Sequence, residues 1–135
     1  MLTKATIALV DDNKMIRELL GQILKDEGFI VHAFGCPTEL LSSAALAEAD
    51  CLLTDLDMPI MNGCKLQANV TRRRPELPVV FITGSDDEDQ RQLALDQGAF
   101  AYLKKPARLV ELVAVLHDAK ATLGCCGGSF RESFR

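Results

Sequence analysis

The stretch TDLDMPIMNG, residues 54–63, decides the fold, and it directly follows the short apolar run CLL at residues 51–53. A short apolar run bounded by turn residues is typical of a buried β-strand, so Asp55 and Asp57 follow the carboxyl end of a strand. Ligands of open α/β sheets bind at that edge, which makes the pair a candidate site. The Pro and the Asn-Gly pair of the same stretch predict a turn into a helix. Alone, the stretch is equally consistent with a simple polar turn.

Similar patterns along the chain predict four further strands and five helices. Apolar, β-branched runs predict strands over residues 6–10, 29–34, 78–83 and 100–103. The first helix begins after the N-cap Asn13, carries the apolar stripe Ile16, Leu19, Leu20, Ile23 and Leu24, and ends at Gly28. Further helices are predicted over about residues 39–47, 64–73 and 107–121. One more is opened by the capping box Ser85-x-x-Glu88, runs to about residue 97 and closes at Gly98.

Five strands that alternate with five helices predict an α/β domain whose parallel sheet is covered on both faces. We therefore expect a doubly wound five-stranded parallel sheet of the flavodoxin-like (βα)5 type, with strand order 2-1-3-4-5. The domain is expected to span residues 1–121. Residues 122–135, rich in Gly, Cys, Ser and Arg from Gly124 on, are expected to form a flexible tail.

Composition and charge restrict the partners of the chain. Its 135 residues suit one domain, and the formal net charge of -4 argues against direct binding of nucleic acid, which requires a basic face. No apolar run approaches the roughly 20 residues that span a bilayer, and the N-terminal residues lack the features of a signal peptide. We therefore expect no membrane contact, a cytoplasmic location and reduced thiols for the five cysteines.

Polar residues stand at the ends of four predicted strands. They are Asp11 and Asp12 after the first strand, Asp55 and Asp57 after the third, Thr83 at the end of the fourth and Lys105 after the fifth. In the expected strand order these ends are neighbours, so three of these four carboxylates converge with one lysine. Proton uptake or a bound cation would relieve their repulsion. Mg²⁺ is the natural cation because it binds oxygen ligands, uses few carboxylates and leaves room for a phosphate oxygen.

With a cation in place, Asp55 is a candidate nucleophile toward phosphorus. Phosphoryl transfer requires positioning and the neutralisation of charge on the transferred group. The Lys105 ammonium and the Thr83 hydroxyl would meet those needs. The residues therefore predict a site that accepts a phosphoryl group.

The same residues resemble a known family, the response-regulator receiver domains of two-component signalling, over about residues 6–119. The family's acidic pair is matched by Asp11-Asp12, its motif Asp-x-x-Met-Pro-x-Met-x-Gly by residues 55–63, its strand-four Thr or Ser by Thr83, its switch aromatic by Tyr102 and its Lys-Pro by Lys105-Pro106. Each match alone is weak, whereas all of them in order at the family spacing form a specific signal. The stretch RPELPVVFITG at residues 74–84 looks most like the FixJ-type branch.

The resemblance implies a phosphoacceptor switch rather than an enzyme with a separate substrate. A phosphohistidine of a histidine kinase or phosphotransfer protein would donate to Asp55, and the receiver would catalyse its own phosphorylation and dephosphorylation. Asp12 and Asp55 would ligate Mg²⁺ directly, Asp11 would assist through water, and Asp57 would offer its backbone carbonyl. Asp57 would also lie beside the water that hydrolyses the aspartyl phosphate, so its carboxylate would affect the lifetime of the phosphorylated state. The Lys105-Pro106 peptide would be cis.

The resemblance also implies how the switch works. Phosphorylation adds about -1.5 to -2 charges at Asp55. Thr83 would then move toward the phosphoryl group, and Tyr102 would turn inward into the vacated space. The face formed by the fourth helix, fifth strand and fifth helix would change and bind a partner or a second receiver.

Two alternatives remain open. Asp55-Leu56-Asp57 also resembles the nucleophile and general acid of an aspartate-nucleophile phosphatase of the haloacid-dehalogenase type, although Pro59 and the position after the third strand argue against it. The other alternative is a pseudo-receiver, a binding module that is not phosphorylated. The complete set of acids together with Thr83 and Lys105 argues against that reading.

Overall fold

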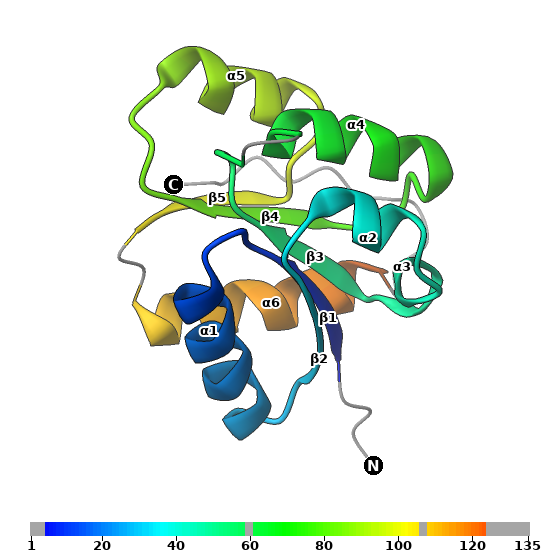
Figure 1. Ribbon diagram of the computed structural model, residues 1–135, viewed down its shortest axis with the longest axis vertical. Helices are drawn as coiled ribbons and strands as arrows, with labels where there is room; N and C mark the ends of the chain where they lie inside the picture. The colour runs from blue at the N-terminus through cyan, green and yellow to red at the C-terminus, as the bar shows by residue number, and fades with distance from the viewer. Residues whose placement is uncertain (1–4, 59–60, 106–107, 124–135) are drawn as a thin grey trace.

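The computed structural model describes residues 5–58, 61–105 and 108–123, and Figure 1 shows one twisted sheet with helices on both faces. The strands are β1 (Thr6–Val10), β2 (Ile30–Phe34), β3 (Cys51–Thr54), β4 (Val79–Thr83) and β5 (Ala101–Lys104). All are parallel, and their order is β2-β1-β3-β4-β5. The predicted fold class and strand order are confirmed.

Helices connect these strands and form the two outer layers (Figure 1). In the described ranges they are α1 (Lys14–Asp26), α2 (Pro37–Leu41), α3 (Ala45–Glu48), α4 (Gly63–Arg73), α5 (Glu88–Asp96) and α6 (Leu109–Leu123). Because every strand is parallel, the turns that follow β1, β3, β4 and β5 meet at one edge of the sheet.

The predicted N-cap of α1 is present, but not every residue of its apolar stripe is buried. The Asn13 side chain caps the helix by accepting the Ile16 N–H at 3.1 Å. Gly28, after the helix, has a φ of 99°, a backbone conformation that glycine adopts without strain. Leu19, one residue of the predicted apolar stripe, is 60% exposed. Leu24, on the side that faces the sheet, is fully buried.

The single helix predicted over residues 39–47 is wrong, because α2 and α3 are separate short helices. Two serines between them make local hydrogen bonds that compete with a continuous helix. The Ser42 hydroxyl donates to the Thr38 carbonyl at 3.0 Å, and the Ser43 hydroxyl oxygen accepts the Ala45 N–H at 3.0 Å. The chain therefore turns here instead of continuing.

The capping box predicted at Ser85 and Glu88 is also wrong, because Asp87 caps α5. Its carboxylate accepts the N–H groups of Asp89 and Gln90 at 3.0 and 3.1 Å. A carboxylate suits the positive end of the helix dipole better than a neutral hydroxyl. Ser85 lies two residues earlier, and its hydroxyl oxygen accepts the Asp87 N–H at 3.1 Å.

The core lies in two layers, one on each face of the sheet. Side chains of α2, α3, α4 and α5 pack on one face against Val10, Leu52 and Phe81. Helices α1 and α6 pack on the other face against Leu9 and Leu53. Neighbouring residues of β1 and β3 thus point to opposite layers, as expected for a parallel sheet buried on both faces.

Some expectations concern residues outside the described ranges. They are the turn at Pro59, the cis Lys105-Pro106 peptide and the tail from Gly124 on. Within the described ranges, no helix combines the length and the apolar character needed to cross a membrane.

Gly63, at the start of α4, lies against the chain segment that carries Asp55. A Cβ atom at this position would lie 2.6 Å from the Asp55 carbonyl oxygen and 2.9 Å from the Leu56 Cα. The Gly63 N–H also donates to the Leu56 carbonyl at 2.7 Å. The glycine therefore allows α4 to approach the end of β3 closely.

We predict that Gly63→Ala lowers the free energy of unfolding by about 1–3 kcal/mol, because the added methyl group presses on backbone atoms that have no room to move. Urea denaturation measures this change. Gly84→Ala is the matched control, since a Cβ there meets no atom within 4 Å. The control should change the stability by less than about 0.5 kcal/mol, and an equal loss in both variants would contradict the steric explanation.

Candidate functional site

Three acids meet at the carboxyl edge of the sheet. Asp11 and Asp12 follow β1, and Asp55 follows the neighbouring strand β3, whose Thr54 pairs with Val10. One carboxylate oxygen of each acid lies within 4.8 Å of the others. Asp11 is 1% exposed, Asp55 is half-buried and Asp12 is exposed. The topology therefore gathers the acids that the sequence placed at separate strand ends.

Lys105 lies between two of these acids. Its Nζ is 3.1 Å from Asp55 Oδ2 and 3.3 Å from Asp11 Oδ2. Partial burial lowers the pKa of the Lys105 ammonium, but the hydrogen bond and charge of Asp55, with Asp11, outweigh this effect and leave the pKa raised. The site thus contains one firmly protonated cation facing two carboxylates.

Hydrogen bonds to both of its oxygens orient the Asp55 carboxylate. Its Oδ1 accepts the N–H groups of Leu56 at 2.6 Å and Asp57 at 3.3 Å, while Oδ2 faces Lys105. Its own N–H donates to the Val10 carbonyl at 3.2 Å. Fixed orientation of this kind is what an acceptor in group transfer needs, because the reacting oxygen is held in place before the reaction.

Asp57 and Thr83 lie near this site but do not join the acid cluster. The Asp57 side chain is exposed, and its backbone N–H rather than its carboxylate contacts Asp55. Thr83 is fully buried, and its hydroxyl oxygen accepts the Ser85 N–H at 3.1 Å. The Thr83 carbonyl accepts the Lys105 N–H at 2.8 Å, which ties the two residues together through the backbone.

Tyr102, on β5, is buried beside this edge of the sheet. It is 5% exposed, and its ring centroid lies 6.0 Å from that of Phe81. Burial, followed by the negative charge of Asp57, raises the pKa of its hydroxyl. The hydroxyl has no hydrogen-bond partner among the described residues. Tyr102 therefore carries a buried polar group that is free to take a new partner.

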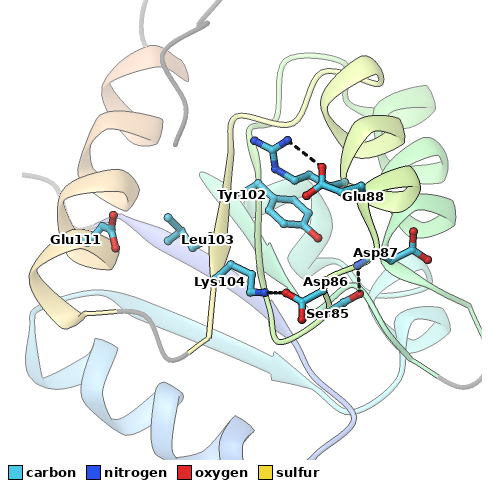
Figure 2. A pocket seen from close by; sticks show the side chains of 9 residues that line it. Ser85, Asp86, Asp87, Glu88, Tyr102, Leu103, Lys104 and Glu111 are labelled. Atoms are coloured by element: carbon cyan, nitrogen blue, oxygen red, sulfur yellow. Dashed lines mark hydrogen bonds and ion pairs between the residues drawn. The ribbon is translucent and has the colours of Figure 1, made fainter.

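A pocket of about 350 Å³ opens between α5, β5 and α6, and Tyr102 forms part of its wall (Figure 2). Lys104 forms an ion pair with Asp86 across it, and Arg91 lies 3.6 Å from Glu88. Sequence reasoning missed the Lys104 pair, because its partner belongs to a separate loop. The pocket occupies the face predicted to change on phosphorylation, whose helices are numbered α5 and α6 here.

The donor set suits a hard divalent cation. Three carboxylates and one ammonium leave an excess of negative charge, and oxygen ligands at this spacing match the preferences of Mg²⁺. Asp12 is the acid of the three that is exposed, so a cation can reach its carboxylate directly. The exposed side of the cluster at Asp12 can therefore hold a cation, while Lys105 contacts Asp11 and Asp55.

Residues 7–117 match the family described as the response regulator receiver domain. The DNA-binding transcriptional regulator NtrC of Salmonella typhimurium is 36% identical over 116 residues, which cover 86% of this chain and 25% of that protein. Nodulation protein W of Bradyrhizobium diazoefficiens is 33% identical over 111 residues, covering 82% of this chain and 49% of that protein. The chain thus spans half or less of the length of these relatives.

Solved structures give the same result. The structure of FixJ-N has a TM-score of 0.82 at 27% identity, covering 93% of this chain and all of that one. A receiver domain protein from Clostridium thermocellum has a TM-score of 0.81 at 29% identity, covering 87% of this chain and 94% of that one. The resemblance inferred from the sequence motifs is confirmed.

We predict that Lys105→Met lowers the free energy of unfolding by about 1.5–3 kcal/mol near neutral pH, the range for hydrogen bonds to charged groups. The pKa of Lys105 is raised on folding, so its contribution is complete below the unfolded value of about 10.4 and is lost as the pH rises through the folded value. Urea denaturation of both proteins should give a stability difference that shrinks at high pH. A difference that does not change with pH would contradict the assigned role of the ammonium.

Proposed function

The chain belongs to the response-regulator receiver domains of two-component signalling, and on that premise we propose that Asp55 accepts a phosphoryl group from a phosphohistidine. The donor is a histidine kinase or a phosphotransfer protein. One observation carries the proposal: Asp55 lies 3.1 Å from Lys105 Nζ and clusters with the carboxylates of Asp11 and Asp12. Lys105 can neutralise charge on a phosphoryl group at Asp55, and a cation held by the neighbouring carboxylates would add the second positive charge.

The transfer is an in-line displacement. An oxygen of the Asp55 carboxylate forms a bond to phosphorus while the bond from phosphorus to the donor imidazole nitrogen breaks, and the imidazole leaves with the electron pair. The backbone N–H groups of Leu56 and Asp57 hold the acceptor, and the Lys105 ammonium offsets charge on the transferred oxygens. These residues make the receiver the catalyst of its own phosphorylation.

Mg²⁺, when bound, would supply positive charge that stabilises the transferred phosphoryl group. Asp12 and Asp55 would be its direct carboxylate ligands, with Asp11 acting through water and Asp57 through its backbone carbonyl. The close approach of Asp11, Asp12 and Asp55 supports this assignment.

Phosphorylation would then alter the face that contains the pocket of Figure 2. Thr83 would exchange its contact with the Ser85 N–H for one with the phosphoryl oxygens. Because the Tyr102 ring is already buried, the exchange would change its packing and hydroxyl contacts more than its exposure. A few kcal/mol between the two arrangements suffices for the modification to shift their populations.

The changed face of α5, β5 and α6 would bind the downstream partner or a second receiver. Exposed charges of both signs line it, among them Lys104 on β5 and Glu111 on α6. The net charge of -4 supports a protein partner rather than direct contact of this chain with nucleic acid.

Mass spectrometry after incubation with acetyl phosphate and Mg²⁺ tests the proposed acceptor. Wild type should gain a phosphate-sized adduct, and Asp55→Asn should gain none because the amide cannot act as the acceptor. Asp26→Asn is the matched control: it removes an exposed acid at the end of α1, outside the acid cluster, and should keep the adduct. An adduct that persists in Asp55→Asn would remove Asp55 from its role.

The same sample distinguishes a receiver from a phosphatase. A receiver traps one phosphoryl group per chain, whereas an aspartate-nucleophile phosphatase releases phosphate repeatedly from a monoester substrate. We expect no sustained turnover of p-nitrophenyl phosphate. Continuous release that disappears in Asp55→Asn would favour the phosphatase, and an intact wild type without any adduct would favour the pseudo-receiver.

Amide hydrogen exchange tests the assigned movement of Thr83. We expect the Ser85 amide to exchange faster in the phosphorylated protein, because it loses the 3.1 Å hydrogen bond to the Thr83 hydroxyl oxygen. Thr83→Ala should show fast exchange in both forms, since its side chain cannot accept that bond. Unchanged protection of Ser85 on phosphorylation of the wild type would contradict the movement.

A further inference from the structure

The Arg17 guanidinium, from the first part of α1, lies against the backbone of the acidic loop. Its Nη1 donates a hydrogen bond to the Asp11 carbonyl oxygen at 2.8 Å. The Asp11 N–H donates to the Phe34 carbonyl, at the end of β2, at 3.1 Å. Both backbone polar groups of Asp11 are thus engaged. Because a peptide unit is planar, holding the Asp11 carbonyl also fixes the plane that leads into Asp12.

Gly35, directly after β2, provides the space for this guanidinium. A Cβ atom at Gly35 would lie 2.8 Å from Arg17 Nη1 and 3.2 Å from its Cζ. Such a contact is too short, so any larger residue would push the guanidinium away. No positive φ explains this glycine. A side chain at position 35 would therefore take the space that the Arg17 guanidinium occupies.

Asp12 depends on this backbone for its position. Its carboxylate is exposed and, within the described ranges, is held by no side-chain hydrogen bond. Asp11, by contrast, is fixed by Lys105 at 3.3 Å and by the Asn13 N–H at 2.9 Å. The placement of the Asp12 carboxylate thus follows from the peptide that Arg17 holds.

We propose that Arg17 is a positioning residue that orients Asp12 for the divalent cation, with Gly35 providing the space it needs. This inference rests on the proposed function of the acidic site. Arg17 touches neither the cation nor the phosphoryl group. It acts through its hydrogen bond to the Asp11 carbonyl oxygen.

Titration with Mg²⁺, followed by amide chemical shifts of the intact chain, tests the inference without any phosphoryl donor. Arg17→Ala should weaken Mg²⁺ binding by about tenfold or more, as is typical for residues that support metal ligands. Lys14→Ala is the matched control. It removes a positive charge from the same part of α1. The Lys14 side chain is 77% exposed and pairs with Glu18 at 4.0 Å. This control should bind Mg²⁺ as wild type does, and a loss equal to that of Arg17→Ala would overturn the inference in favour of general charge.

Gly35→Ala tests the mechanism independently. With Arg17 present, the methyl group should displace the guanidinium and weaken Mg²⁺ binding. In the Arg17→Ala background, the same change should cause no further loss, because nothing remains to displace. Additive losses in the two backgrounds would overturn the assigned link between the residues.

The outcomes distinguish a failure of the proposed function from a failure of the positioning role of Arg17 alone. Wild type that binds no Mg²⁺ at this site would defeat the proposed function itself. Wild type that binds Mg²⁺, together with an Arg17→Ala variant of equal affinity, would defeat only the positioning role. If Arg17→Ala does not fold, as circular dichroism would reveal, Gly35→Ala decides: weaker binding supports the inference and wild-type affinity overturns it.

Discussion

Repulsion between carboxylates at the ends of two adjacent parallel strands is the constraint on which the rest of the site depends. The register of β1 and β3 pairs Val10 with Thr54, so the acids that follow these residues lie side by side. Two such charges in a partly buried position are unfavourable without a cation. Lys105, from the end of β5, provides one cation, and the exposed side of the cluster at Asp12 is open to a second. This balance supports the proposed phosphoryl acceptor, because the same positive charges that separate the acids could neutralise a transferred group.

The loop between β4 and α5 connects the acid cluster to the outer face of the molecule. Short polar contacts hold it: the Ser85 N–H contacts Thr83, the Asp87 carboxylate caps α5, and Asp86 pairs with Lys104. Each of these contacts is partly exposed, and exposed ion pairs contribute little to stability. New charge at Asp55 can therefore compete with them at small cost, which explains how a local modification could reach α5 without disturbing the core.

The strands and the cluster of acids were predictable, because the strands follow from the hydrophobic pattern of the sequence and the cluster follows from the strand order. A buried parallel strand appears as a continuous apolar run, and acids after two such runs must meet if the strands are neighbours. Contacts that depend on tertiary distance were not predictable. The choice of Asp87 over Ser85 as the cap of α5 depends on where the loop crosses the sheet edge. The approach of Arg17 to Gly35 depends on the angle at which α1 leaves β1, and the only available signals were a basic residue and a glycine far apart in sequence.

A crystal structure of the protein with Mg²⁺ and beryllium trifluoride, a mimic of the phosphoryl group, tests the central claim most directly. The account predicts one cation in contact with the carboxylates of Asp12 and Asp55. It also predicts the beryllium bonded to an Asp55 oxygen, with the Lys105 ammonium in contact with the fluorides. A cation bound elsewhere, or an adduct on an acid other than Asp55, would contradict it.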